Sequence, residues 1–262
     1  MLQSDLTLAI QAAREAGALT LEYFGGQYEV EDKGGGDPLT TADLAANALL
    51  GERLRSARPD YGWLSEETVD DQERLSCQKT WIVDPIDGTR EFVEGLPEYV
   101  ISVALCDGGT PTVGVIYNPA RDKLYAAVQQ GGAFLNGKRI FCSETSELKT
   151  ATSIVSRSEE KRGEVSPFLP HIGEVTPVGS VAYKLALVAA GEADMNFSVQ
   201  PKNEWDVCAG DLLVREAGGH MLNLQGEVRM YNQVDTLIQD GLVAGNSELT
   251  HQMLRLKNEV NP

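Results

Sequence analysis

The chain has 262 residues, 42% of them hydrophobic, which is enough to bury the core of one large domain or of two closely packed halves. Its formal net charge of −17 disfavours a nucleic-acid polymer or an anionic membrane surface as partner, because both require a basic patch. The N-terminal stretch lacks a signal-peptide pattern, and no apolar run reaches the roughly 18 residues that span a bilayer. These features predict a cytoplasmic globular protein with no integral membrane segment.

The four cysteines and three histidines are widely separated along the chain. They form neither a C-x-x-C nor an H-x-x-x-H pattern, so a zinc site or a disulfide framework is not indicated. We therefore expect four reduced thiols and no metal ligands of nitrogen or sulfur.

Two helices are expected in the first 57 residues. Apolar residues at intervals of three and four predict a helix from Ser4 to Phe24, with Leu21 on its inward face. A glycine-rich break at 34–38 precedes a second helix at about 41–57, with Leu44 turned inward.

Strands dominate the segment that follows. They are expected at 62–64, 80–83, 99–105, 112–117 and 123–128, with a tight hairpin turn at Asn136-Gly137. Because strand follows strand without intervening helices, this sheet is expected to be largely antiparallel.

After residue 150 strands and helices alternate. Strands are expected at 152–156, 173–178, 194–197, 219–222 and 241–244, and helices near 158–165, at 181–190, at 206–217 and from Ser247. The predicted architecture is layered α/β in two halves: residues 1–150 with a metal site, and residues 151–262 supplying Asp206 and substrate contacts. Within the second half, Ser158–Lys161 fits S-x-x-K formally, but this polar stretch is expected to be exposed and without function.

Acidic residues follow two of the expected strands and start one of the helices. Asp84 ends the apolar run Trp81–Val83, and Pro85 and Gly88 allow a sharp turn that brings Asp87 toward it. Further acids are Glu66-Glu67 and Asp206. A set of oxygen donors alone suits Mg²⁺ or Mn²⁺ and suggests metal-assisted phosphoryl hydrolysis, although helix caps and solvated charges remain the alternative.

Four motifs in this order resemble one family. They are DPLTTAD at 37–43, Glu-Glu at 66–67, DPIDGT at 84–89 and WDVCAG at 205–210. The pattern resembles the Mg²⁺-dependent, lithium-sensitive phosphatases that include inositol monophosphatase, the CysQ-type 3'(2'),5'-bisphosphate nucleotidases and some fructose-1,6-bisphosphatases. The resemblance implies an α/β fold, a five-layered αβαβα sandwich of the inositol monophosphatase and fructose-1,6-bisphosphatase type. It also implies two or three Mg²⁺ ions, with Mn²⁺ as an alternative.

The resemblance also implies roles for individual residues. The first ion would be held by Glu67, Asp84 and the main-chain carbonyl of Ile86, and the second by Asp84, Asp87 and Asp206. Activation of the attacking water would fall to Thr89, hydrogen-bonded to Asp43, with Glu67 nearby. The expected substrate contacts are Gly88, Thr89, Arg90, Ser180 and Lys184. The loop 33–38 would correspond to a mobile segment that closes over the ions in relatives.

Three local features favour a nucleotidase over an inositol phosphatase. Arg90-Glu91-Phe92 and Glu204-Trp205-Asp206 are nucleotidase-like, and Val199 stands where inositol monophosphatases carry a glutamate. In contrast, the segment 207–219 is closer to the inositol phosphatase version.

The favoured activity is hydrolysis of the 3'-phosphate of adenosine 3',5'-bisphosphate to AMP, which would place the protein in sulfur metabolism. The alternatives are an inositol-1-monophosphatase or broad-specificity sugar phosphatase, and a non-catalytic regulator that binds metal or nucleotide. The expected partner is a small phosphorylated substrate, and a homodimer is left open.

Overall fold

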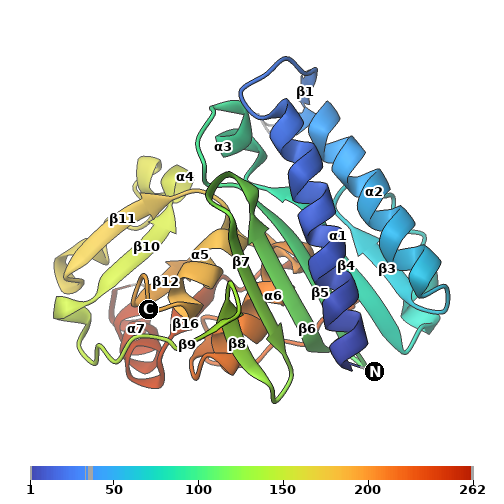
Figure 1. Cartoon of the computed structure of the whole chain (residues 1–262). Helices are drawn as coiled ribbons and strands as arrows, with labels where there is room; N and C mark the ends of the chain where they lie inside the picture. The colour runs from blue at the N-terminus through green and yellow to red at the C-terminus, as the bar shows by residue number, and fades with distance from the viewer. Residues whose placement is uncertain (1, 33, 35–37, 261–262) are drawn as a thin grey trace.

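The computed structural model describes residues 2–32, 34 and 38–260 (Figure 1). Its first half contains α1 (Leu2–Tyr23), β1 (Val30–Asp32), β2 (Pro38–Thr40), α2 (Thr41–Ala57), β3 (Gly62–Ser65), β4 (Lys79–Asp87), α3 (Thr89–Val93), β5 (Val100–Asp107), β6 (Thr110–Asn118), β7 (Lys123–Val128), β8 (Gly132–Leu135) and β9 (Lys138–Ile140). Its second half contains β10 (Thr152–Ser156), α4 (Arg157–Lys161), β11 (Glu174–Val178), α5 (Val181–Ala189), β12 (Met195–Ser198), β13 (Lys202–Asn203), α6 (Glu204–Glu216), β14 (His220–Leu222), β15 (Leu237–Ile238), β16 (Leu242–Gly245) and α7 (Ser247–Val260).

A seven-stranded sheet runs in the order β3-β4-β5-β6-β7-β8-β9. Only the β3–β4 pair is parallel, so the expectation of a largely antiparallel sheet is confirmed. Along β5, Val100 and Ala104 pack into one core while Ile101 and Val103 pack into another. The strand is thus buried on both faces, which explains its uninterrupted apolar sequence.

Helices α1 and α2 cover one face of this sheet (Figure 1). The buried side of α1 consists of small residues such as Ala9 and Ala16, and a Cβ on Gly17 would lie 2.6 Å from the Tyr117 ring. The expected inward positions of two leucines are wrong, since Leu21 is 42% and Leu44 49% exposed. The close approach of α1 to β6 leaves room only for small side chains, so Leu21 is displaced from the buried face of α1. The buried face of α2 runs through Ala46, Leu50 and Leu54, so Leu44 lies on a different side of that helix.

The second sheet is five-stranded, in the order β11-β10-β12-β16-β14, and mixes parallel with antiparallel pairs. Helices α5 and α6 share a core with strands of both sheets, and α7 packs on the outer face of the second sheet together with Val155 and Phe197. The layers therefore follow the order αβαβα, as the resemblance implied.

Two further points complete the fold. In the expected mobile loop 33–38, residues 33 and 35–37 lie outside the described residues. Over the described residues, no helix is both long and apolar enough to cross a membrane.

Candidate active site

The end of β4 carries Asp84 and Asp87 on the same side of the sheet. Asp84 pairs with Ser102 of β5 and Asp87 with Val100, so β4 contains one extra residue between the two pairs. Residues three apart on a regular strand face opposite sides, whereas this bulge restores a common side. Both aspartates are buried, at 1% and 8% exposure, and line a cavity of about 580 Å³.

Asp206 enters the same cavity from the start of α6. It is the third helical residue, and the Asn203 N–H donates to its Oδ2 at 2.7 Å, which closes a capping box. Asp43 has the equivalent position in α2, where the Thr40 N–H donates to its Oδ2 at 2.8 Å. Each aspartate is thus oriented by the backbone of its own helix start.

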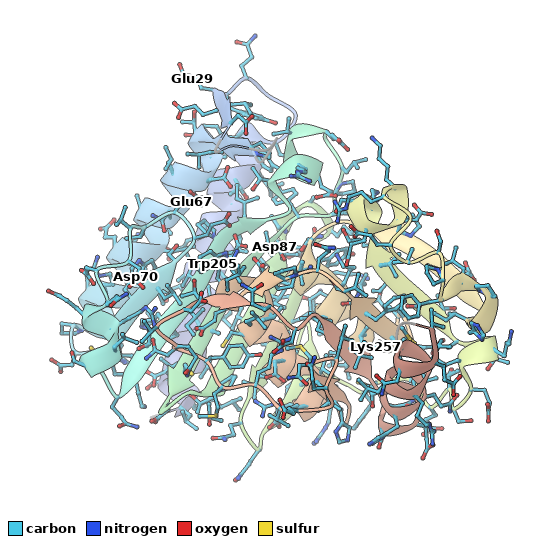
Figure 2. All side chains as sticks on the ribbon, turned by 180° about the vertical axis from the view of Figure 1, so that it is seen from behind. Glu29, Glu67, Asp70, Asp87, Trp205 and Lys257 are labelled. Atoms are coloured by element: carbon cyan, nitrogen blue, oxygen red, sulfur yellow. The ribbon has the colours of Figure 1, made fainter. Side chains whose placement is uncertain are left out.

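The acidic residue that follows β3 into the cavity is Glu66, not the expected Glu67. The parallel register pairs Ser65 with Val83, and the Glu66 N–H donates to the Val83 carbonyl at 3.2 Å, so Glu66 lies alongside Asp84. The Glu67 carbonyl instead accepts a hydrogen bond from the Asn47 side chain of α2, and Figure 2 labels Glu67 on this side of the molecule. The glutamate that lies beside Asp84 in the structure is therefore one residue earlier in the chain than expected.

The side chains of Glu66, Asp84, Asp87 and Asp206 are here called the carboxylate cluster, and their negative charges repel one another. Burial raises the pKa of Asp84 well above its usual range, and the charges of Glu66, Asp87 and Asp206 raise it further. Burial, then Asp87 and Glu66, likewise raise the pKa of Asp206. Such a group is ionised at neutral pH only at a high electrostatic cost, which a bound cation would remove.

The donor chemistry of this cluster fits a hard divalent ion. Among the residues that the structure describes, no three Asp, Glu, His or Cys side chains lie close enough together to hold one ion by themselves. Mg²⁺ does not need such a cage, because it is usually held by one or two carboxylates, retained waters and phosphate oxygens of the substrate. Paired carboxylates, together with the Ile86 carbonyl, meet that requirement.

Thr89 links the cavity to Asp43. Its Oγ1 lies 3.1 Å from Asp43 Oδ1 and 3.0 Å from the Ile86 carbonyl oxygen, so the expected Thr89–Asp43 contact is present. Gly88, the residue before α3, has φ of +99°, and a Cβ there would lie 2.9 Å from the Glu98 carbonyl oxygen. Only glycine fits this turn. Burial raises the pKa of Asp43, which makes it a stronger proton acceptor than an exposed aspartate.

Ser180 and Lys184 line the cavity, but their polar atoms are bound within the protein. Ser180 Oγ donates to Asp87 Oδ2 at 2.8 Å, and Lys184 Nζ donates to the carbonyls of Val178 and Ser180 at 3.3 and 2.7 Å. Burial lowers the pKa of Lys184 to about 8, against the opposing effect of the Asp87 charge. Lys184 is 3% exposed and lies close enough to Asp87 to feel its charge, and its expected contact with the substrate stays a prediction.

Five basic side chains, here called the basic group, line the same cavity: Arg90, Arg157, Lys161, Lys184 and Lys202. Three of these residues were not predicted from the sequence to lie at the site. Arg157 and Lys161 belong to α4, which was expected to be exposed, and Lys202 carries no motif. Arg157 is paired with Glu91 at 3.2 Å and with Glu98 at 2.5 Å.

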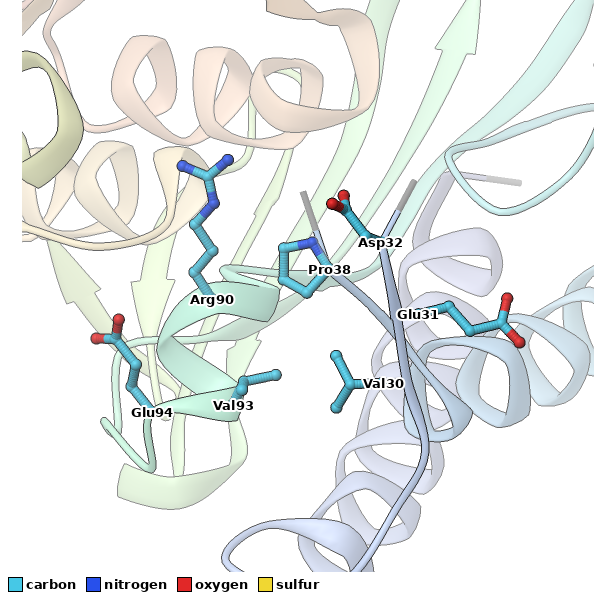
Figure 3. Close-up of a pocket in the computed structure, with 7 residues that line it drawn as sticks. All are labelled: Val30, Glu31, Asp32, Pro38, Arg90, Val93 and Glu94. Atoms are coloured by element: carbon cyan, nitrogen blue, oxygen red, sulfur yellow. The ribbon is translucent and has the colours of Figure 1, made fainter. Parts of the chain in front are cut away.

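Arg90 also borders a neighbouring pocket of about 400 Å³ (Figure 3). In that pocket Val30 and Val93 point toward one another, between the β1–β2 hairpin and α3. Arg90 is exposed and lines both the cavity and this pocket, and its expected contact with the substrate stays a prediction.

Glu204, part of the nucleotidase-like Glu-Trp-Asp motif, has a structural role. Its buried carboxylate accepts hydrogen bonds from the N–H groups of Asn232 and Gln233 at 2.7 and 2.8 Å. Burial raises the pKa of Glu204 to about 7. The motif therefore carries less information about substrate than its sequence suggests.

A layered αβαβα fold with an all-oxygen carboxylate cluster at the end of a central strand defines a class of metal-assisted phosphate-processing proteins. Residues 1–260 match the model of the inositol monophosphatase family, and the chain belongs to that family of phosphatases.

Its relatives carry more than one activity in their names. The chain is 36% identical to an inositol-1-monophosphatase of Mesorhizobium japonicum, over 95% of this chain and 94% of the relative. It is 33% identical to the 3'(2'),5'-bisphosphate nucleotidase CysQ of Shigella flexneri, over 88% and 95%. The fold resembles a Thermotoga maritima IMPase with a TM-score of 0.86 at 30% identity, covering 97% of each chain.

Proposed function

We propose that the protein is a Mg²⁺-dependent phosphomonoesterase that hydrolyses the 3'-phosphate of adenosine 3',5'-bisphosphate, releasing AMP and inorganic phosphate. The observation that carries this proposal is the pairing, in one cavity, of the carboxylate cluster with the basic group. Carboxylates that need a cation suit a metal-assisted phosphate reaction, and the basic side chains suit a substrate with a second anionic group.

The residues proposed to hold the metal are Glu66, Asp84, Asp87, Asp206 and the carbonyl of Ile86, with Glu66 in place of Glu67. Bound Mg²⁺ would supply positive charge that polarises the phosphate and stabilises the attacking and leaving oxygens. Mn²⁺ has the same ligand preference and is the alternative ion.

The proton of the attacking water has a path through Thr89. The Thr89 hydroxyl accepts the water proton as its own proton passes to Asp43 Oδ1, 3.1 Å away. No phosphorylated side chain is involved, because water itself attacks phosphorus and the ribose 3'-oxygen departs. The backbone N–H groups of Gly88 and Thr89 are proposed to bind the phosphate.

The nucleotide is favoured over inositol phosphate by Val199. This residue occupies the position of the inositol-binding glutamate and packs its side chain against the core of the second sheet. Loss of such an acceptor costs about 1–3 kcal/mol when its partner hydroxyl stays unpaired. Inositol 1-phosphate is the second candidate, and the name of the Mesorhizobium japonicum relative favours it.

Phosphate release tests the proposal. The purified protein would be assayed with Mg²⁺ on adenosine 3',5'-bisphosphate, inositol 1-phosphate and fructose 1,6-bisphosphate, with and without lithium, and compared by kcat/KM. The Asp87→Asn variant serves as the control for contaminating phosphatase.

A preference of tenfold or more for the nucleotide supports the proposal. A preference for inositol phosphate would change the proposed substrate but not the proposed metal-assisted hydrolysis. Absence of hydrolysis of all three compounds rejects the enzyme and favours a regulator that binds metal or nucleotide.

A further inference from the structure

Glu159 in the short helix α4 is buried, although its stretch was expected to be exposed. It is 1% exposed, and its Oε1 accepts hydrogen bonds from Ser198 Oγ at 2.7 Å and from the N–H groups of Val199 and Gln200 at 3.0 and 3.2 Å. Its Oε2 is buried and makes no hydrogen bond within the described part of the chain. Glu159 therefore fastens α4 to the turn that follows β12.

That turn leads directly to Lys202, which lines the cavity. Lys202 Nζ donates to the carbonyls of Gln200 and Pro201, both at 3.1 Å. An ammonium group has three N–H donors, so one is left for a ligand. Lys202 is thus a partly buried cation held in one place by its own turn.

Two opposing effects act on the ammonium group of Lys202. Burial lowers the pKa of Lys202, and the carboxylates of Glu159 and Asp206 oppose that shift. Glu159 lies behind the cavity wall rather than on it. A ligand in the cavity therefore meets the ammonium group without meeting the Glu159 carboxylate.

Two α4 residues extend this polar surface. Lys161 and Ser158 line the cavity, and Ser158 Oγ lies 2.8 Å from Ser156 Oγ. Two other cations of the basic group are less available, since Arg157 is paired with two glutamates and Lys184 is 3% exposed. The fifth, Arg90, is exposed and also borders the neighbouring pocket of Figure 3.

We propose that Ser158, Lys161 and Lys202 form a second anion subsite that binds a phosphate or sulfate carried by the substrate in addition to the phosphate that is hydrolysed. Glu159 is the positioning residue of this subsite. The inference rests on the proposed function, because it assigns a place to the second anionic group of that substrate.

The first test compares substrates with and without the second phosphate. The ratio of kcat/KM for adenosine 3',5'-bisphosphate to that for adenosine 3'-monophosphate would be measured for the wild type and for Lys202→Met, Lys202→Arg and Lys138→Met. Loss of a charge-assisted hydrogen bond should lower the ratio about tenfold or more in Lys202→Met. Lys202→Arg should retain most of it, and Lys138→Met should retain all of it, because Lys138 is an exposed residue of β9.

The Glu159→Gln variant tests whether Glu159 positions Lys202 or only stabilises the fold. The substitution keeps the shape of the side chain but weakens the charge-assisted hydrogen bonds by which Glu159 holds the turn that leads to Lys202. It should raise KM for the bisphosphate about three- to tenfold and lower kcat for either substrate much less. If kcat/KM falls equally for both substrates, Glu159 has a structural role only.

The second test does not depend on turnover. AMP carries only the phosphate that the subsite would bind, so its affinity would be measured by calorimetry in EDTA, with adenosine as the neutral comparison. The subsite is supported if AMP binds more tightly than adenosine and if Lys202→Met weakens AMP binding about tenfold. This result would support the subsite even if no substrate is hydrolysed, in which case only the proposed function fails. If AMP binds no better than adenosine, or if Lys202→Met keeps the wild-type discrimination in both tests, the subsite is rejected even though the phosphatase proposal stands.

Discussion

The carboxylate cluster and the basic group line one cavity, but the chain holds them differently. The aspartates accept hydrogen bonds from backbone N–H groups at a strand end and at helix starts, whereas Lys184 and Lys202 donate to backbone carbonyls. The acids raise one another's pKa, while Arg157 has glutamate partners of its own. A cation would therefore relieve the acidic side, whereas two members of the basic side, Arg157 and Lys184, already have acidic neighbours within the protein.

The largest effect is expected from removing a charge on the acidic side. Asp87→Asn should lower kcat by at least about 10²-fold, because it removes a proposed ligand of a charge-stabilising metal. Turnover would be measured at saturating Mg²⁺, with circular dichroism as the control for folding. A folded variant with nearly wild-type turnover would contradict the metal assignment.

A matched pair of variants separates Glu66 from Glu67. Glu66→Gln should lower kcat about 10- to 100-fold, since Glu66 lines the cavity beside Asp84. Glu67→Gln should have a much smaller effect. The apparent Mg²⁺ dissociation constant, measured for both variants, should rise for Glu66→Gln alone. The reverse order would restore the assignment made from the sequence.

Thr89→Val tests the proton path with a side chain of similar shape. Loss of the hydroxyl should lower kcat about tenfold or more without changing Mg²⁺ affinity. Thr89→Ser keeps the hydroxyl beside Asp43 and should retain most of the activity. If valine and serine behave alike, the hydroxyl has no part in the reaction.

The smallest effect on turnover is expected at Asp211, a buried acid of α6 outside the cavity. It already has partners, with Arg215 Nε at 3.1 Å and Tyr231 Oη donating at 2.9 Å, yet burial raises the pKa of Asp211 to about 6. The folded-state pKa lies above the ordinary value of 3.8, so the stabilising contribution is full below about pH 4 and is lost as pH rises through 6.

The measurement is urea unfolding of wild type and Asp211→Asn from pH 4 to 7. The stability of the wild type relative to the variant should fall by about 1 to 3 kcal/mol over this range, with or without Mg²⁺. A difference that does not vary with pH would show that the Asp211 carboxyl titrates as in the unfolded chain.

Local patterns predicted most of the elements. The second helix at 41–57 and the strands at 123–128 and 152–156 have the expected bounds, because capping residues and turn residues act over a few positions. The buried faces of α1 and α2 were predicted less well. Leu21 is exposed because the close approach of α1 to the sheet, which periodicity does not report, selects small residues. Leu44 is exposed because the buried face of α2 runs through Ala46, Leu50 and Leu54 instead.

Some residues of the candidate site were likewise predicted from the sequence, and others were not. DPIDGT pointed to Asp84, Asp87 and Thr89, since these residues are contiguous and share one turn. The choice between Glu66 and Glu67 depended on the register of β3 against β4, and a shift by one residue reverses the side that a side chain faces. Glu159 was assigned to the surface because its partners are about 40 residues away.

By itself, the sequence determined the order of the elements, the strand-end aspartates and the all-oxygen character of the site, because each depends on neighbouring residues. The tertiary structure decided which glutamate enters the cavity and that α4, expected on the surface, lines it. It also decided that Lys184 is buried, whereas Lys202 is only partly buried on the cavity wall. The choice of glutamate depends on the pairing of β3 with β4, in which Ser65 lies opposite Val83. The position of α4 depends on the hydrogen bonds of Glu159 to residues about 40 positions away. The energies of these contacts arise only when the segments pack together.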